Sequence, residues 1–158
     1  MSGFQGCPGS RTISYDDAPA QEGAATARVP SQLRQWPVQL HLVSPAAPYF
    51  QGADVLLCAD CVPFAVGNFH QDFLKGKALA VACPKLDGGQ EVYAKKLKGL
   101  FEESNIKSLT VAIMEVPCCR GLAQLALNAW EESSRKAPVK AAVIGLKGDL
   151  LQEEWLRI

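Results

Sequence analysis

Residues 108–116, SLTVAIMEV, set the architecture of this 158-residue chain. The stretch is apolar almost throughout and rich in β-branched side chains, which is typical of a strand buried on both faces of a parallel sheet. Pro117 follows it and suits the first turn of a helix. Residues 120–135 then place apolar side chains on one helical face. The pattern therefore predicts a buried strand that leads directly into a helix.

The same alternation of strand and helix recurs along the chain. Apolar runs predict further strands at residues 38–43, 54–58, 77–83 and 139–146, and periodic spacing predicts helices at 64–75 and 90–104. Such alternation produces βαβ units with right-handed crossovers. We therefore expect the α/β class, as a three-layer α/β/α sandwich with a mainly parallel, Rossmann-like sheet of about five strands.

Both ends of the chain differ from this core pattern. Residues 1–30 are rich in Gly, Ala, Pro, Ser and Asp without a hydrophobic period, which indicates an extended N-terminal arm before a single α/β cysteine-containing domain at 31–158. Cys7 lies in a turn of this arm, where we expect an exposed free thiol. At the other end, residues 147–149 predict a hairpin turn, and residues 150–158 return either as an edge strand or as a short helix.

Composition excludes several classes of partner. Sixteen basic residues balance sixteen acidic ones, so no net field favours nucleic acid or an anionic membrane. No apolar run approaches the roughly 18–20 residues that span a bilayer, and residues 1–7 lack the basic and apolar regions of a signal peptide. The apolar runs suffice for a core without disulfides, so the six cysteines indicate reduced thiols and a cytoplasmic location.

Five of the six cysteines fall where a predicted strand ends and a helix begins. Cys58 and Cys61 follow one strand, Cys83 follows the next, and Cys118 and Cys119 follow the third. Because parallel strands gather their carboxyl ends at one edge of a sheet, we expect these thiols to lie close together there. Converging thiolates are the ligands of zinc and of iron–sulfur centres. The sequence therefore predicts a metal site with all five cysteines as candidate ligands.

The sequence leaves the metal and the role of the thiols open. Four thiolates suit a single zinc ion, a single iron ion or an iron–sulfur cluster of unspecified type. Of the vicinal pair, Cys119 is nearer the helix start and is the favoured ligand, although both members are candidates. A second hypothesis is a thiol–disulfide redox site, because Cys61 opens a helix whose amino terminus would lower the pKa of its thiol. A third is a structural docking module that holds a zinc ion or no metal.

Motifs of common enzyme classes are absent from the sequence. No G-x-G-x-x-G or Walker loop supports nucleotide binding, and no G-x-S-x-G elbow supports a hydrolase. His41, within the predicted first strand, and His70, within a predicted helix, both lie away from the expected cysteine edge, which favours structural roles. The motifs therefore leave open whether the chain is an enzyme.

Several segments together resemble a known family. They are SQLRQWPVQLHL at residues 31–42, Ala46 with PYF at 48–50, ADCVPFA at 59–65, VACPKLD at 81–87, MEVPCC at 114–119 with Gly121 and Leu122, and GCPGS at 6–10. The set is similar to the C-terminal region of ferredoxin-type (4Fe-4S) iron–sulfur cluster-binding proteins of anaerobic bacteria and archaea. The similarity covers nearly the whole chain.

The resemblance implies an electron-transfer role and a partner. Family members carry a ferredoxin domain upstream of this region, so the expected partner is a ferredoxin domain or another redox protein. Two positions depart from the family pattern. Arg120 stands where the family usually has a glycine after the cysteine pair, and Cys58 occupies a position that is often not cysteine. The resemblance therefore implies Cys61, Cys83 and the 118–119 pair as the principal ligands.

Overall fold

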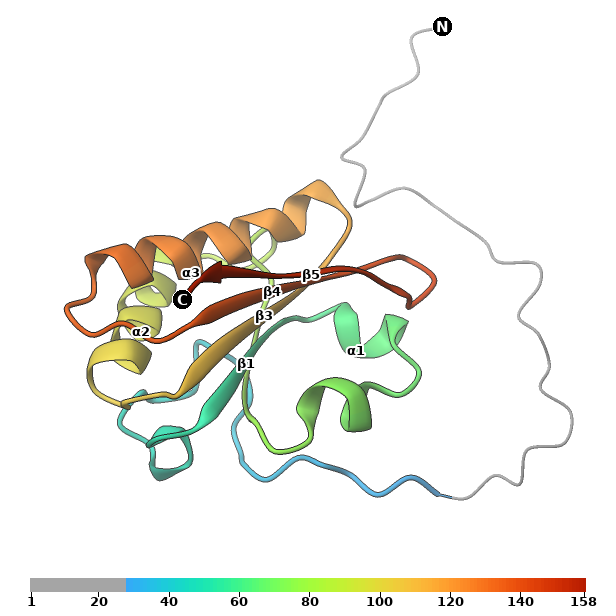
Figure 1. The fold of residues 1–158 in the computed structure, drawn as a ribbon, viewed down its shortest axis with the longest axis horizontal. Coiled ribbons are helices and arrows are strands. Elements are labelled where there is room, and N and C mark those ends of the chain that lie inside the picture. The colour runs from blue at the N-terminus through green and yellow to red at the C-terminus, as the bar shows by residue number, and fades with distance from the viewer. Residues whose placement is uncertain (1–27) are drawn as a thin grey trace, which may run out of the picture.

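The structure, a computed structural model, describes residues 28–158, which contain a five-stranded sheet of order β2-β1-β3-β4-β5 (Figure 1). The strands are β1 (Asp54–Ala59), β2 (Ala78–Ala82), β3 (Ser108–Met114), β4 (Val139–Ile144) and β5 (Leu150–Arg157). Strands β1 to β4 are parallel, and β5 returns antiparallel to β4. The predicted α/β class with a mainly parallel, Rossmann-like sheet is confirmed. The predicted arm, as far as residue 27, and Cys7 lie outside the described residues.

Helices cover both faces of the sheet because the crossovers run in two directions. α2 (Gln90–Glu102) and α3 (Arg120–Glu132) carry the chain from β2 to β3 and from β3 to β4, and they pack against each other (Figure 1). α1 (Val62–Ala65) and the π-helical turn η3 (His70–Leu74) carry it the opposite way, from β1 to β2. Right-handed crossovers in opposite directions place their helices on opposite faces. α1 and η3 have only 4 and 5 residues, whereas α2 and α3 have 13 each.

Burial on both faces explains why the central strands are continuous apolar runs. All residues from Val55 to Ala59 in β1 and from Ala78 to Ala82 in β2 are buried. On α3, Leu122, Ala126 and Ala129 are buried at the spacing of one helical face. Of the helices within residues 28–158, none is long and apolar enough to cross a membrane.

The predicted first strand at residues 38–43 is wrong. Only Gln39 forms a bridge, in parallel with Val81 of β2, and the chain then turns so that the Val43 N–H donates to the Gln39 carbonyl at 3.0 Å. Leu40 and Val43 are both buried, and a strand cannot place residues three apart on one face. Insertion of these two side chains into the core therefore favours a turn over an extended strand.

Gln35 and the following segment close the outer edge of β2. The Gln35 side-chain amide donates to the Leu79 carbonyl at 2.8 Å and accepts the Leu79 N–H at 2.7 Å. The Leu40 N–H donates to the Val81 carbonyl, and the Val81 N–H donates to the Val38 carbonyl, both at 2.8 Å. An uncovered edge would expose unpaired backbone groups that promote association. The segment that precedes β1 therefore seals this edge of the sheet.

The predicted helix at residues 64–75 is also wrong, because it is broken into α1 and η3. Val66 has an extended backbone immediately after α1, which ends the first helix. Asn68 then starts the second turn, since its carbonyl accepts the Asp72 N–H at 3.0 Å and its side chain donates to the Asp72 carboxylate at 2.8 Å. Phe64, expected on the buried face of one continuous helix, is consequently 92% exposed.

The predicted turn at residues 147–149 is confirmed, and it leads into β5 as an edge strand rather than a helix. The Gly148 N–H donates to the Gly145 carbonyl, and the Gly145 N–H donates to the Asp149 carbonyl, both at 2.8 Å. Gly148 has a φ of 92°, and a Cβ atom there would lie 2.2 Å from the Ala65 carbonyl oxygen. The hairpin therefore packs directly on the end of α1.

Gly148→Ala is expected to lower the free energy of unfolding by at least about 1–2 kcal/mol, since the left-handed backbone and the contact with Ala65 both oppose a Cβ atom. Gly67→Ala is the matched control, because no atom lies within 4 Å of a Cβ at that position. Its effect is expected to stay within about 0.5 kcal/mol. Urea denaturation followed by circular dichroism measures both values. Equal effects of the two substitutions would contradict the packing of the hairpin on α1.

Candidate thiol site at the carboxyl edge of the sheet

The strand order creates a switch point between β1 and β3. From β1 the chain crosses to β2 on one side, and from β2 it returns past β1 to β3 on the other. In doubly wound sheets the loops that leave two such strands diverge, and ligands bind between them. Cys61 follows β1 at this point, and Cys118 and Cys119 follow β3. Cys83 follows β2, the other neighbour of β1.

Backbone register brings the three loops to one level. Ala59 of β1 pairs with Ala82 of β2, and the Asp60 N–H donates to the Ala82 carbonyl at 3.2 Å. A Cβ atom at Gly121, near the start of α3, would lie 3.6 Å from the Cβ atom of Pro84. The loop after β2 therefore contacts the start of α3. The structure thus brings together three loops that are remote in sequence.

The five predicted ligand residues differ in exposure. Cys61 is exposed, Cys83 and Cys118 are half-buried, and Cys58 and Cys119 are buried. The Cys61 thiol interacts electrostatically with Cys83 and Cys118. The thiols of Cys58 and Cys119 interact with each other and with Cys61. The cysteines therefore form one neighbourhood, in which three thiols are accessible from solvent and two are not.

Cys58 is a core residue of β1. Its side chain is fully buried, and its thiol donates to the Ala59 carbonyl at 3.3 Å. Burial, followed by the charges of Asp60 and of the neighbouring thiols, raises the pKa of Cys58 far above its ordinary value. A thiol that is held protonated is a poor ligand and a poor nucleophile. The C-x-x-C spacing from Cys58 to Cys61 therefore does not place two equivalent sulfurs at the surface.

Cys61 stands at the start of α1 on the exposed rim. Its thiol donates to Oδ1 of Asp60 at 3.4 Å. Partial burial, the hydrogen bond and charge of Asp60, and the charges of two neighbouring thiols together raise the pKa of Cys61 to about 11. The expectation that a helix terminus lowers this pKa is therefore wrong. α1 is a single short turn with a weak dipole, and the groups that act on the thiol are acidic.

The turn after β3 separates the vicinal cysteines. Pro117 starts a 3-10 turn, η4 (Pro117–Cys119), which leads into α3. Cys119 is buried, whereas Cys118 is half-buried, and the two thiols interact electrostatically. Burial raises the pKa of Cys119 to about 11 against a lowering effect of the Met114 backbone, and Cys118 adds to the rise. Cys118, rather than the favoured Cys119, is thus the member that lies on the accessible side.

Asp87 closes the loop that carries Cys83. The Cys83 N–H donates to Asp87 Oδ2, and the Asp87 N–H donates to the Cys83 carbonyl, both at 2.9 Å. The hydroxyl of Tyr93, a buried residue of α2, donates to the same Oδ2 atom. The hydrogen bond from Tyr93, followed by that from Cys83, lowers the pKa of Asp87. From the sequence, Asp87 is one of the charged residues that flank the strand ends and could tune the site electrostatically, although surface solvation is the favoured account. The sequence does not predict its hydrogen bonds with Cys83 and Tyr93.

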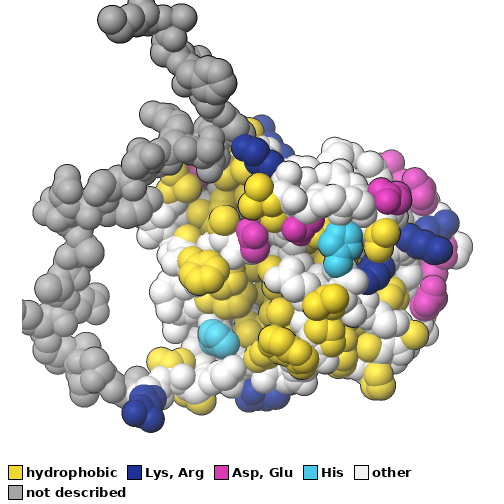
Figure 2. All heavy atoms as spheres, turned by 180° about the vertical axis from the view of Figure 1, so that it is seen from behind, with side chains coloured by type: hydrophobic (Ala, Val, Ile, Leu, Met, Phe, Trp, Pro, Cys, Tyr) yellow, Lys and Arg dark blue, Asp and Glu magenta, His cyan; other side chains and the backbone are white. Residues whose placement is uncertain are grey.

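His41 lies beside this loop, which corrects its expected place away from the cysteine edge. Its Nε2 atom is 2.8 Å from the Gly88 carbonyl oxygen, and its ring centroid is 4.3 Å from that of Tyr93. The turn that replaces the predicted first strand brings His41 to this position. Figure 2 shows the two histidines well apart on the reverse face of the molecule.

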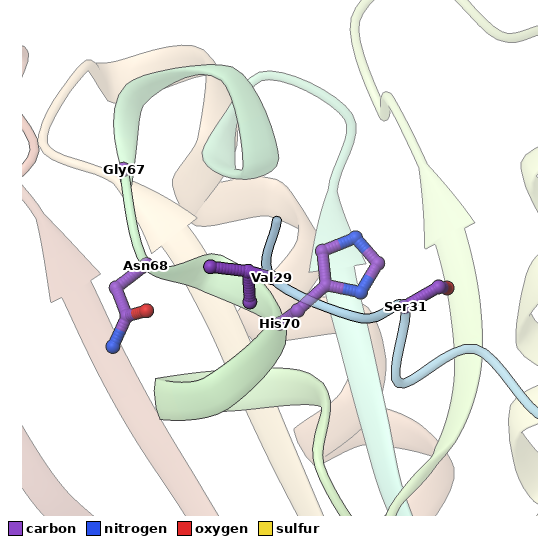
Figure 3. A pocket seen from close by; sticks show the side chains of 5 residues that line it. All are labelled: Val29, Ser31, Gly67, Asn68 and His70. Atoms are coloured by element: carbon purple, nitrogen blue, oxygen red, sulfur yellow. The ribbon is translucent and has the colours of Figure 1, made fainter. Parts of the chain in front are cut away.

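His70 belongs to a different part of the surface. Its Nδ1 atom accepts the Gln32 N–H at 3.0 Å, which ties the N-terminal segment to η3. A hollow of about 280 Å³ is lined by Val29, Ser31, Gly67, Asn68 and His70 (Figure 3). Among the described residues no cysteine lines this hollow, and the contact with Gln32 fits the structural role expected of His70.

The chemistry of the side chains at this edge favours metal binding, but their positions do not form a closed site. Accessible thiols beside carboxylates such as Asp60 provide donors that suit zinc or iron. Within residues 28–158, however, no three Cys, His, Asp or Glu side chains stand close enough together to hold an ion. The backbone brings the loops together, but the side chains do not close around a common centre. Ligation would therefore require rotation of the thiol side chains.

Comparisons with known proteins agree with the fold. Residues 47–158 match the family described as a Rossmann-like domain. A protein of Archaeoglobus fulgidus, described as uncharacterized, is 31% identical over 117 residues, which cover 74% of this chain and 81% of that protein. No solved structure matches the chain. Neither description mentions iron, sulfur or ferredoxin, so the resemblance to ferredoxin-type proteins is confirmed only as far as the Rossmann-like fold.

Alkylation of Cys61 in metal-free, reduced protein is expected to have an unusual pH profile. Its rate with iodoacetamide should rise about tenfold per pH unit up to about pH 10 without a plateau, because thiolate is the reactive form and the pKa is about 11. Cysteine-resolved mass spectrometry measures the rate. The urea-unfolded protein is the control and should level off near the ordinary pKa of 9.0. A plateau for folded Cys61 at or below pH 9 would contradict the acidic surroundings described above.

Proposed function

The chain belongs to the Rossmann-like domain family. We propose that it binds a metal ion or an iron–sulfur cluster that serves electron transfer. The proposed ligands are Cys61, Cys83 and the pair Cys118–Cys119, which follow β1, β2 and β3. Cys58 packs in the core below them.

Three thiol-bearing loops meet at the carboxyl edge of the sheet, at the switch point and beside it, and this meeting carries the proposal. The switch point is where folds of this class bind their ligands. Buried cysteines are common as small apolar residues, but Cys61 is exposed and Cys83 and Cys118 are half-buried. Packing therefore does not explain why accessible thiols follow three neighbouring strands, whereas a shared ligand does.

The charges at this edge favour a cation. Asp60 contacts Cys61, and Asp87 contacts the backbone of Cys83. Ionised thiols would repel one another and these carboxylates, and a bound cation relieves that repulsion. The donor set therefore fits a thiophilic cation better than it fits an anionic ligand.

The residues of the chain and the bound group would contribute different things. An iron–sulfur centre would accept and release an electron, whereas a zinc ion would only tie the loops together. The chain holds the thiols at one edge and keeps Cys119 away from water. The resemblance noted from the sequence supports a ferredoxin domain or another redox protein as partner, in a reducing, cytoplasmic setting.

A thiol–disulfide site is the second candidate, and one observation favours it. Cys118 and Cys119 are adjacent, and their thiols interact electrostatically with each other and with Cys61. Their chemistry as a redox pair is disfavoured, because the pKa values of Cys61 and Cys119 are both raised to about 11. Little thiolate is then present at neutral pH, and thiol–disulfide exchange slows accordingly.

Anaerobic purification followed by metal and sulfide analysis separates the candidates. Brown protein with absorbance above about 400 nm and bound sulfide supports an iron–sulfur cluster. Colourless protein with one zinc ion per chain supports a structural role for the metal. Metal-free protein that takes up two thiol-blocking groups only after reduction supports the dithiol site. Protein with neither a bound metal nor a reducible disulfide contradicts both proposals.

Cys83→Ser is expected to weaken metal affinity by at least about tenfold, an effect already produced by loss of residues that merely support a ligand. Cys7→Ser is the matched control, since residue 7 is no part of the proposed site, and it should keep the affinity of the wild type. Metal per chain is measured by mass spectrometry of the element after equilibrium dialysis. Equal loading of the two variants would remove Cys83 from the site.

A further inference from the structure

We infer that Asp87 and Tyr93 are positioning residues that fix the Cys83 loop at the carboxyl edge of the sheet, next to the switch point. His41 supports the same loop through its contact with Gly88. The inference rests on the proposed function, because it makes Cys83 the fixed ligand to which the other thiols adjust. The loop that follows Cys83 is hydrogen-bonded to His41, which precedes β1, and to Tyr93 of α2.

Asp87 ties down both polar groups of the Cys83 backbone. Its Oδ2 atom accepts the Cys83 N–H, and its own N–H donates to the Cys83 carbonyl, each at 2.9 Å. Rotation of the Cys83 backbone would break both bonds at once. The direction of the Cys83 side chain from the backbone is therefore set by Asp87, and only rotation about the side-chain bond remains.

Tyr93 connects Asp87 to the rigid part of the molecule. It is 1% exposed and lies within α2, and its hydroxyl donates to the same Oδ2 atom that accepts the Cys83 N–H. Hydrogen bonds to a carboxylate are stronger than those between neutral groups, and a buried phenol without an acceptor would be destabilising. The loop is thus joined through one carboxylate oxygen to a helix that packs on the core.

Two further contacts hold the loop on either side of Asp87. The Gln90 side chain donates to the Pro84 carbonyl at 2.5 Å. His41 Nε2 lies 2.8 Å from the Gly88 carbonyl oxygen, and the His41 ring packs beside that of Tyr93. The segment from Pro84 to Gly88 is consequently held at both ends, by a helix and by the turn that precedes β1.

Within residues 28–158 the other accessible thiols have less support. The Cys61 thiol donates to its neighbour Asp60, and the Cys61 carbonyl accepts N–H groups only from the single turn of α1 that follows it. Cys118 lies in a short 3-10 turn. Among the accessible thiols of residues 28–158, Cys83 is therefore the one whose backbone N–H is held by a charged side chain. A set of metal ligands forms most readily around a donor that is already in place. Cys83 is therefore the fixed donor to which the other thiols adjust.

Cysteine-resolved alkylation of metal-free, reduced, full-length protein tests the inference without any metal. Asp87→Ala should raise the alkylation rate of Cys83 on the order of tenfold, the size expected for loss of a hydrogen bond to a charged acceptor. Tyr93→Phe should raise it by a smaller factor. Because Tyr93→Phe keeps the Asp87 carboxylate, its effect cannot come from removal of a negative charge. The rates at Cys61 and Cys118 should not change.

Asp72→Ala is the matched control, because it removes an acid that is hydrogen-bonded to Asn68 outside the loop. It should leave every cysteine at its wild-type rate. Acceleration of all cysteines in both test variants, including buried Cys58, would mean general loss of packing and would overturn the inference. An unchanged Cys83 rate in both variants would overturn it as well. If Asp87→Ala fails to fold, the alkylation rate of Cys83 in Tyr93→Phe alone tests the inference.

Zinc loading of the same variants distinguishes this inference from the proposed function. Faster alkylation of Cys83 together with zinc affinity at least about tenfold weaker than wild type supports both. Faster alkylation of Cys83 in a protein whose wild type takes up no metal supports the fixing of the loop and contradicts the proposed function. Unchanged alkylation with normal zinc binding contradicts the inference and leaves the proposed function supported.

Discussion

Parallel hydrogen bonding along both edges of β1 organises the domain. β1 pairs with β2 on one side and with β3 on the other. Parallel neighbours require long crossovers, and right-handed crossovers in two directions require helices on both faces. The same arrangement brings the loops that follow β1, β2 and β3 to one edge. The meeting of the cysteines is therefore a consequence of strand order and not of any local motif.

The edge combines stiff and adaptable parts. On the side of β2, the loop of Cys83 is fixed by Asp87 and by a buried tyrosine of α2. On the side of β1, α1 is only one turn long, and Phe64 within it is 92% exposed. One fixed donor beside others that can rotate suits a site that closes around an ion after the fold has formed.

Sequence periodicity predicted the regular part of the fold because strands buried on both faces have uninterrupted apolar runs. It failed where core side chains come from turns. Leu40 and Val43 enter the core at a spacing of three, and the extended Val66 breaks a helix whose apolar pattern continues. The strand ends also predicted that the cysteine-bearing loops meet at one edge, whereas the thiols as a common ligand sphere remain a prediction. The pKa of Cys61 and the place of His41 were not predictable, because both depend on groups brought near by the fold.

Whether the converging thiols bind one ion is a question about coordination. X-ray absorption at the zinc edge of anaerobically handled, zinc-loaded protein counts the sulfur atoms around the metal and gives their distance. The proposed site predicts three or four sulfur neighbours at about 2.3 Å. A coordination sphere made only of nitrogen and oxygen atoms, or a protein that retains no zinc, would contradict it.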